Sequence, residues 1–182
     1  MINEYKIFTQ EIPLIFSEIP KIAESIVFDE KKYDIIIAMG IASGITSVRI
    51  ERVAINLADA NIAYNCGKTP NDEKIIPNAP LAYFSTLPTR KIHEQLLENG
   101  IPSSLSYSAG TYACNHFFYS LMHYFSNNKE FEGKVKLIGF IHIPLTPEIV
   151  ATNKSSSIAS MSIGTLKQAI EIVVKTCIEE IK

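Results

Sequence analysis

Two short, isoleucine-rich apolar runs constrain the fold of this chain more than any other feature. The first run, YDIIIAM at residues 33–39, is closed by Gly40, and the second, VKLIGFIHI at residues 135–143, ends before Pro144. Runs of this length and composition are typical of strands buried on both faces, as in parallel sheets. Such a sheet needs a layer of helices on each face, so the two runs predict an α/β fold.

Helical and extended segments alternate along the rest of the chain. Apolar periodicity predicts helices over 12–26 (with Pro13 in the first turn), 88–98, 112–125 and from about 162 to the C-terminus. Residues 47–57 and 104–108 are expected to be extended, while 64–80 and 151–160 are expected to be loops. This alternation predicts a single domain over residues 1–182, a three-layer α/β/α sandwich with a mixed, largely parallel central sheet.

Charge and cysteine usage exclude several function classes. Lys and Arg number 17 and Asp and Glu 19, so the net charge of −2 argues against nucleic-acid and membrane-surface partners. The three cysteines, Cys66, Cys114 and Cys177, are widely spaced and form no CxxC, which argues against a disulfide framework and a zinc site. With no visible signal peptide or apolar run of about 18 residues, we expect a cytoplasmic protein with free thiols.

Cys114 is the first candidate for chemistry. It follows Gly110 at the start of a predicted helix, where unpaired backbone N–H groups favour a thiolate and can receive an oxyanion. A nucleophile at a strand–turn–helix junction is a recurring arrangement in enzymes. The competing interpretation is that Cys114 is a small buried apolar residue, as most free cysteines are.

A thiol nucleophile needs a base, and His142 is the best placed of the four histidines. It ends the second apolar run, and the carboxyl ends of strands are where α/β sheets hold ligands. His93 is expected to be solvated, and His116 and His123 share the helix of Cys114 at spacings unsuited to hydrogen bonding with its thiol. The alternative is that His142 only binds a loop carbonyl.

Glu51 is the candidate for the group that orients the base. It lies between two arginines in the extended segment SVRIERVAINL, whose other residues are mostly apolar, and an inward charge there needs a partner. A local ion pair with Arg49 or Arg52 is the alternative, and Asp59 is a weaker second candidate. A metal site made by Cys114 with two histidines lacks the usual ligand spacing, so no metal is expected.

At these residues the chain resembles the pyroglutamyl peptidase type I family. The resemblance runs from about residue 33 to the C-terminus. It rests on ERVAIN (51–56), PLAYFSTLP (80–88), SAGTYACN (108–115) and GFIHIP (139–144), and Met161-Ser162 resembles the start of the family's last helix. Four ordered motifs of this length are specific.

The resemblance implies a cysteine peptidase that removes N-terminal pyroglutamate, with Cys114 as nucleophile, His142 as base and Glu51 orienting it. It further implies an α/β/α sandwich, no cofactor, a small peptide or amide substrate, and a homo-oligomer (a dimer or tetramer). The lactam pocket is expected to be lined by Tyr112, Ala113, Phe117, Ile41 and Ile62, with Asn61 at the position of the arginine in the family's DAR motif.

Several departures accompany the resemblance. The family's first strand and its GFxPFG loop, whose phenylalanines clasp the lactam ring, have no counterpart, so the domain is expected to be shortened at its N-terminus. Each missing phenylalanine would remove apolar burial worth about 1.5–3 kcal/mol. The missing strand would leave a sheet edge that another chain could cover. Ile45 and Asn61 also replace arginines of the family's AGGR and DAR motifs.

These departures leave three interpretations. The first is a pyroglutamyl peptidase that is truncated or binds its substrate through other groups. The second is a related thiol enzyme that acts on a different amide, lactam or acyl substrate. The third is a non-catalytic paralogue, which an intact set of Glu51, Cys114 and His142 argues against.

Overall fold

The computed structural model describes residues 5–13, 15, 17–29, 33–60, 69–127, 135–152 and 157–182. The helices there are α1 (Ile19–Val27), α2 (Thr89–Glu98), α3 (Ala113–Ser126), α4 (Pro147–Thr152) and α5 (Ile163–Glu180). The strands are β1 (Ile35–Ile41), β2 (Val48–Glu51), β3 (Val53–Ile55), β4 (Ala82–Phe84), β5 (Ser103–Ser106) and β6 (Leu137–Ile143). Within these ranges no helix is both long and apolar enough to cross a lipid bilayer.

The central sheet has the strand order β1-β6-β2-β5. β1 runs parallel to β6 and β2 runs parallel to β5, while β2 and β6 are antiparallel. The predicted mixed, largely parallel sheet is therefore confirmed. A second, two-stranded antiparallel sheet is formed by β3 and β4.

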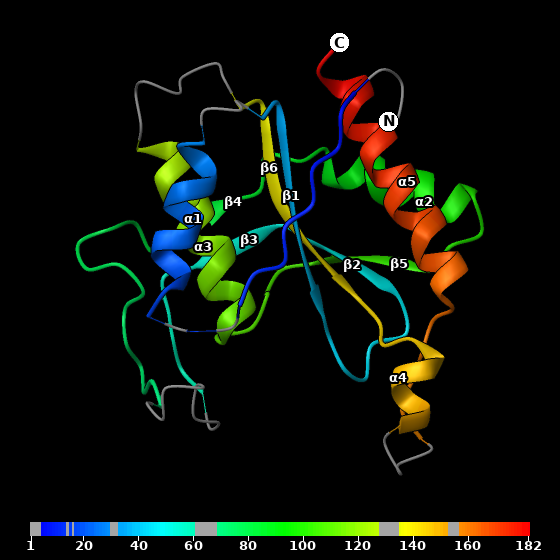
Figure 1. The fold of residues 1–182 in the computed structure, drawn as a ribbon, viewed down its shortest axis with the longest axis horizontal. Helices are drawn as coiled ribbons and strands as arrows, with labels where there is room; N and C mark the ends of the chain where they lie inside the picture. The colour runs from blue at the N-terminus through cyan, green and yellow to red at the C-terminus, as the bar shows by residue number, and fades with distance from the viewer. Residues whose placement is uncertain are drawn as a thin grey trace.

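Helices cover both faces of the central sheet, with α1 and α3 on one face and α2 and α5 on the other (Figure 1). The side chains of β6 alternate between these layers. Ile138 and Phe140 pack with α1 and α3, and Leu137 and Ile141 pack with α2 and α5. Burial on both faces explains why the sequence of β6 is a continuous apolar run.

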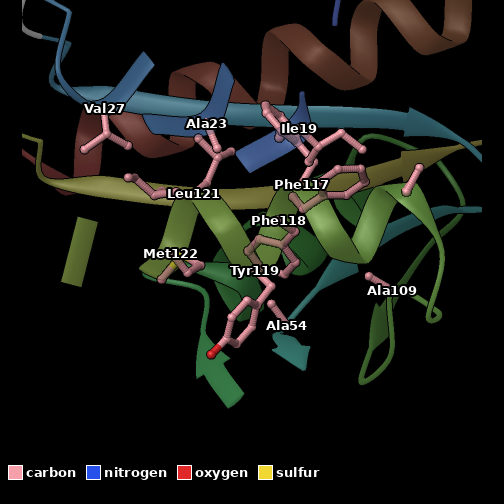
Figure 2. Packing of buried hydrophobic residues seen from close by; sticks show 14 of the residues in the cluster. Ile19, Ala23, Val27, Ala54, Ala109, Phe117, Phe118, Tyr119, Leu121 and Met122 are labelled. Carbon is pink, nitrogen blue, oxygen red and sulfur yellow. The ribbon is translucent and has the colours of Figure 1, made fainter. Parts of the chain in front are cut away.

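The core on the α3 face is mainly aliphatic and aromatic (Figure 2). Phe117 of α3 lies beside Ile19 of α1 in the same buried cluster, and Phe118 packs on Phe140 of β6 with ring centroids 5.7 Å apart. This packing fixes α3 against the sheet, and with it the residues at the start of α3.

The first helix begins later than the sequence pattern predicts. Residues 5–13 are not helical, and α1 begins at Ile19 with Pro20 in its first turn. A helix starting at residue 12 would place Pro20 in its interior, where the ring clashes with the carbonyl four residues earlier and a backbone donor is lost. The prediction of a helix over 12–26 is therefore wrong in its first half.

The predicted extended segment 47–57 divides into two strands that belong to different sheets. The division falls at Arg52, whose N–H donates to Ser106 O at 2.8 Å and whose carbonyl accepts from Ser85 N at 2.9 Å. Two short elements were not predicted, the three-residue β4 and the six-residue α4, which buries no side chain. Elements this short carry too few apolar positions to give a periodic signal.

Candidate active site

Cys114 is the second residue of α3, directly after a sharp turn. Gly110 adopts a left-handed conformation (φ 81°), which a residue without a Cβ adopts at no steric cost. Tyr112 is extended at the N-cap, and α3 begins at Ala113. The Cys114 thiol, which is neither buried nor fully exposed, therefore lies beside the partially positive N-terminus of a 14-residue helix, as the sequence predicts.

Gly40 of β1 makes room for this thiol. A Cβ at Gly40 would lie 2.9 Å from Sγ of Cys114 and 2.9 Å from Cζ of Phe140, closer than side-chain packing allows. Gly40 is also the register partner of His142 in the parallel β1–β6 pair. Sequence reasoning treated Gly40 only as the end of a strand, because nothing in a single sequence shows which side chain a glycine faces.

His142 and Glu51 meet through the antiparallel pairing of β6 with β2. Arg49 lies opposite His142 and Glu51 opposite Phe140, so His142 and Glu51 are diagonal neighbours on one face. Nδ1 of His142 lies 2.8 Å from Oε1 of Glu51. Both residues are buried, Glu51 completely, and the other oxygen of Glu51 has no hydrogen-bond partner among the described residues.

The imidazole of His142 lies between a carboxylate and a thiol. Burial lowers the pKa of His142, but hydrogen bonds with Cys114 and Glu51 and the charges of the same two groups raise it, and the net pKa is about 9. At neutral pH this pKa favours an imidazolium, the charge state that pairs with a thiolate. The ring of Phe140, 4.9 Å from the imidazole between centroids, packs against it.

The alternatives for Glu51 are resolved by its neighbours. Arg52 reaches Tyr107, with 3.4 Å between Nη1 and the hydroxyl and 5.4 Å from the guanidinium carbon to the ring centroid. Asp59 is exposed, and its backbone N–H donates to Thr111 O at 3.1 Å. The structure thus brings Glu51, and not Asp59, to His142, and it pairs Glu51 with the histidine rather than with an arginine.

The other three histidines lie apart from this cluster. His116 is buried in α3, and burial lowers its pKa to about 4. His123 bonds Tyr83 at 2.9 Å through Nδ1, and His93, expected to be solvated, is half-buried and bonds Ser103 at 2.8 Å. Among the described residues no group of three His, Cys, Asp or Glu side chains is arranged to hold a metal ion.

The six expected pocket residues have different surroundings. Ala113 and Phe117 are buried in the α1–α3 core, and Tyr112 is 36% exposed. Ile41 is 54% exposed, and strand alternation places it on the face of β1 opposite to Gly40. Asn61 and Ile62 lie outside the described residues, as does Cys66.

Asn115 was not assigned a role by sequence reasoning, although it follows the nucleophile candidate. Its side chain is fully buried, donates to the carbonyls of Ile55 and Leu57 at 2.9 and 3.0 Å, and accepts from Ile55 N at 3.0 Å. These bonds fasten the start of α3 to β3, the strand directly after Glu51 and Arg52. An asparagine among the apolar residues at the start of a predicted helix was the available signal, because a buried amide needs several partners.

This arrangement has the components of nucleophilic acyl transfer. It combines a thiol at a helix N-terminus, an imidazole that contacts the thiol, and a carboxylate on the other side of the imidazole. Such a set can attack a carbonyl carbon, stabilise the oxyanion with backbone N–H groups and protonate the leaving group.

Comparisons with known proteins agree with this chemistry. The family model described as pyroglutamyl peptidase matches residues 1–180. A pyrrolidone-carboxylate peptidase of Bacillus mycoides is 40% identical over 179 residues, which is 98% of this chain and 80% of the relative. One from Bacillus cereus is 42% identical over 176 residues, 96% of this chain and 78% of the relative.

Solved structures give the same result. A mutant pyrrolidone carboxyl peptidase from Pyrococcus furiosus superposes with a TM-score of 0.90 at 37% identity, covering 100% of this chain and 86% of that one. The pyroglutamyl peptidase I from Bacillus amyloliquefaciens superposes with a TM-score of 0.81 at 36% identity, covering 91% and 75%.

Proposed function

Because this chain belongs to the pyroglutamyl peptidase family, we propose that Cys114, His142 and Glu51 carry out its reaction as nucleophile, base and orienting acid. The reaction is that of a cysteine peptidase, hydrolysis of the amide bond that follows an N-terminal pyroglutamyl residue. The observation that carries the assignment is the 2.8 Å bond between His142 Nδ1 and Glu51 Oε1. It engages one ring nitrogen and leaves Nε2 for the thiol.

In the proposed mechanism, the thiolate of Cys114 attacks the carbonyl carbon next to the lactam ring. The oxyanion that forms is stabilised by backbone N–H groups at the start of α3, that of Cys114 among them. His142, as imidazolium, then protonates the leaving amine, and the C–N bond breaks to give a thioester. A water molecule deprotonated by His142 hydrolyses the thioester, releasing pyroglutamate and the free thiol.

The pocket and the assembly are also proposals. Tyr112, Ala113 and Phe117 would form the apolar wall next to the nucleophile, and Asn61 and Ile62 would also bind the substrate. Ile41 is left out of this wall, because strand alternation turns its side chain to the face of β1 away from the Cys114 thiol. A small peptide or amide would be the substrate, the chain would act in the cytoplasm, and it would assemble as a homo-oligomer. Sedimentation of the purified protein measures the last of these directly.

The test of the function is hydrolysis of a pyroglutamyl-aminocoumarin substrate, with thiol alkylation followed in parallel. Wild type is compared with Cys114→Ala and with Cys177→Ala, which removes a thiol on the other face of the sheet. Turnover that Cys114→Ala abolishes and Cys177→Ala retains supports the proposal. Selective alkylation of Cys114 without turnover would instead indicate a thiol enzyme with a different substrate. An inert Cys114 without turnover would indicate a non-catalytic paralogue.

A further inference from the structure

Arg49 is the residue directly opposite His142 in the antiparallel β2–β6 pair. Opposite residues in such a pair project from the same face of the sheet with Cβ atoms about 4.5–5.5 Å apart. Glu51, two residues later on β2, projects from this face as well, which its bond to His142 demonstrates. The Cβ atom of Arg49 therefore lies next to that of His142, the proposed base.

The guanidinium of Arg49 has no structural role within the described residues. Arg49 is exposed, although Val48 and Ile50 on either side of it are buried. No hydrogen bond or ion pair with any described residue engages it. Arginine stays charged at every physiological pH, so the guanidinium of Arg49 is a cation at the edge of the site that is available to bind an anion.

The surface next to Arg49 is polar. Its neighbour across the parallel β2–β5 pair is Ser104, which is partly exposed and lies 3.2 Å from Ser47 between hydroxyl oxygens. Across the sheet the register then reads Gly40, His142, Arg49, Ser104. The thiol lies at the Gly40 end of this row, so Arg49 and Ser104 lie beyond the imidazole, on the side away from the nucleophile.

Arg49 and Ser104 lie on the side of His142 where the leaving group of the reaction is expected. In the proposed mechanism the lactam lies at the thiol, and the departing amine must reach His142 to be protonated. The peptide beyond that nitrogen then extends past the imidazole, toward the side of the sheet where Arg49 and the hydroxyls of Ser47 and Ser104 lie. A carboxylate one residue beyond the scissile bond is within the reach of an extended arginine side chain.

We propose that Arg49 is a specificity-determining residue that favours leaving peptides with an acidic residue directly after the scissile bond. This inference rests on the proposed function, since it assigns the leaving-group side of the same site. The interaction is solvent-exposed, so the expected preference is modest, on the order of three- to tenfold.

The test compares two substrates of nearly equal size, pyroglutamyl-glutamate amide and pyroglutamyl-glutamine amide. The ratio of their kcat/KM values is measured for wild type and Arg49→Gln. The matched control is Arg90→Gln, which makes the same charge change at an exposed arginine on α2, on the other face of the sheet. We expect Arg49→Gln to lower the glutamate-to-glutamine ratio by about three- to tenfold and Arg90→Gln to leave it unchanged. An unchanged ratio in active Arg49→Gln would overturn the proposal.

A second measurement decides the question if wild type does not cleave these peptides. The rate of Cys114 alkylation by iodoacetate, an anion, is divided by the rate with neutral iodoacetamide. If Arg49→Gln lowers this ratio and Arg90→Gln does not, anion recognition at Arg49 stands while the pyroglutamyl substrate fails. If neither substitution changes it in an inactive wild type, both proposals fail.

Discussion

The two faces of the central sheet each contain a glycine that permits close packing, but the groups packed against the two glycines differ in kind. On the α2–α5 face, a Cβ at Gly139 would collide with the Ser85 hydroxyl and lie 2.6 Å from Leu87 Cδ1. On the α3 face, a Cβ at Gly40 on the neighbouring strand would lie 2.9 Å from the Cys114 sulfur. Both glycines permit close approach, but only Gly40 does so next to a reactive group. Close packing at a glycine therefore occurs on both faces of this sheet, and it adjoins the candidate site on the α3 face only.

The two described free thiols differ in the same way. Cys177 of α5 is fully buried among apolar side chains, and burial, followed by the charge of Glu180, raises its pKa to about 12. Cys114 starts a helix and contacts His142. A sequence presents the two residues as equivalent cysteines, and their environments separate an inert thiol from a candidate nucleophile.

The largest expected effect comes from exchanging each thiol for alanine. Cys114→Ala should lower kcat by more than about a thousandfold, because the proposed nucleophile is lost. Cys177→Ala should retain kcat and instead lower the free energy of unfolding by about 1 kcal/mol, because it leaves a small cavity. Steady-state kinetics and urea unfolding measure the two effects. If both variants lost kcat equally, Cys114 on the α3 face could not be distinguished functionally from Cys177 on the α2–α5 face.

Removing the charge of Glu51, the proposed orienting acid, should have the next largest effect. Glu51→Gln keeps the size of the side chain but loses its charge, and we expect kcat to fall by about 10²- to 10⁴-fold. The His142 pKa should fall below about 9, because the carboxylate raises it and burial opposes it. The pH dependence of Cys114 alkylation reports this shift. Wild-type kcat in Glu51→Gln would exclude Glu51 from the mechanism.

The two glycines provide a sharper comparison with a smaller effect. Gly40→Ala should displace the Cys114 sulfur or Phe140 and lower kcat by about 10- to 100-fold. Gly139→Ala is the matched control, since it overpacks the other face and should cost about 1–3 kcal/mol of stability while folded molecules keep their activity. Activity is measured per folded molecule at a temperature where both variants are native. A greater activity loss in Gly139→Ala would contradict this assignment.

The smallest effect concerns acid stability. Burial lowers the pKa of His116 from 6.5 to about 4, so between these values the unfolded chain binds a proton that the folded chain does not. The free energy of unfolding should therefore decrease as the pH falls from 6.5 to 4, by up to about 3 kcal/mol from this group. His116→Gln should flatten this slope. Denaturant titrations at several pH values make the measurement, and a slope unchanged in His116→Gln would contradict it.

Long elements were predictable from this sequence, and contacts between distant residues were not. The runs that form β1 and β6 carry continuous apolar signals, and α3 and α5 repeat at the helical period. The start of α1 was misplaced because apolar periodicity continues through Pro20 while the backbone cannot. The break at Arg52 leaves no local trace, since the residues on both sides of it are extended.

The candidate site was found from residue chemistry and from motif resemblance, but its geometry was not. Glu51 and His142 are 91 residues apart, and their contact depends on the antiparallel register of β2 against β6. That register, the facing of Gly40 toward Cys114 and the exposure of Arg49 are properties of the folded sheet. A single sequence gives candidates for such contacts, and only the fold selects among them.

The strand order β1-β6-β2-β5 has a consequence for how this molecule is made. During synthesis, β1, β2 and β5 emerge from the ribosome before β6, yet β6 must insert between β1 and β2 in the central sheet. Until β6 emerges, both of those strands present an unpaired inner edge, a known liability for association with other nascent chains. Because β6 carries His142, the proposed base, hydrolysis should be recovered only after this gap has closed. The time course with which hydrolysis recovers during refolding would therefore report when β6 inserts between β1 and β2.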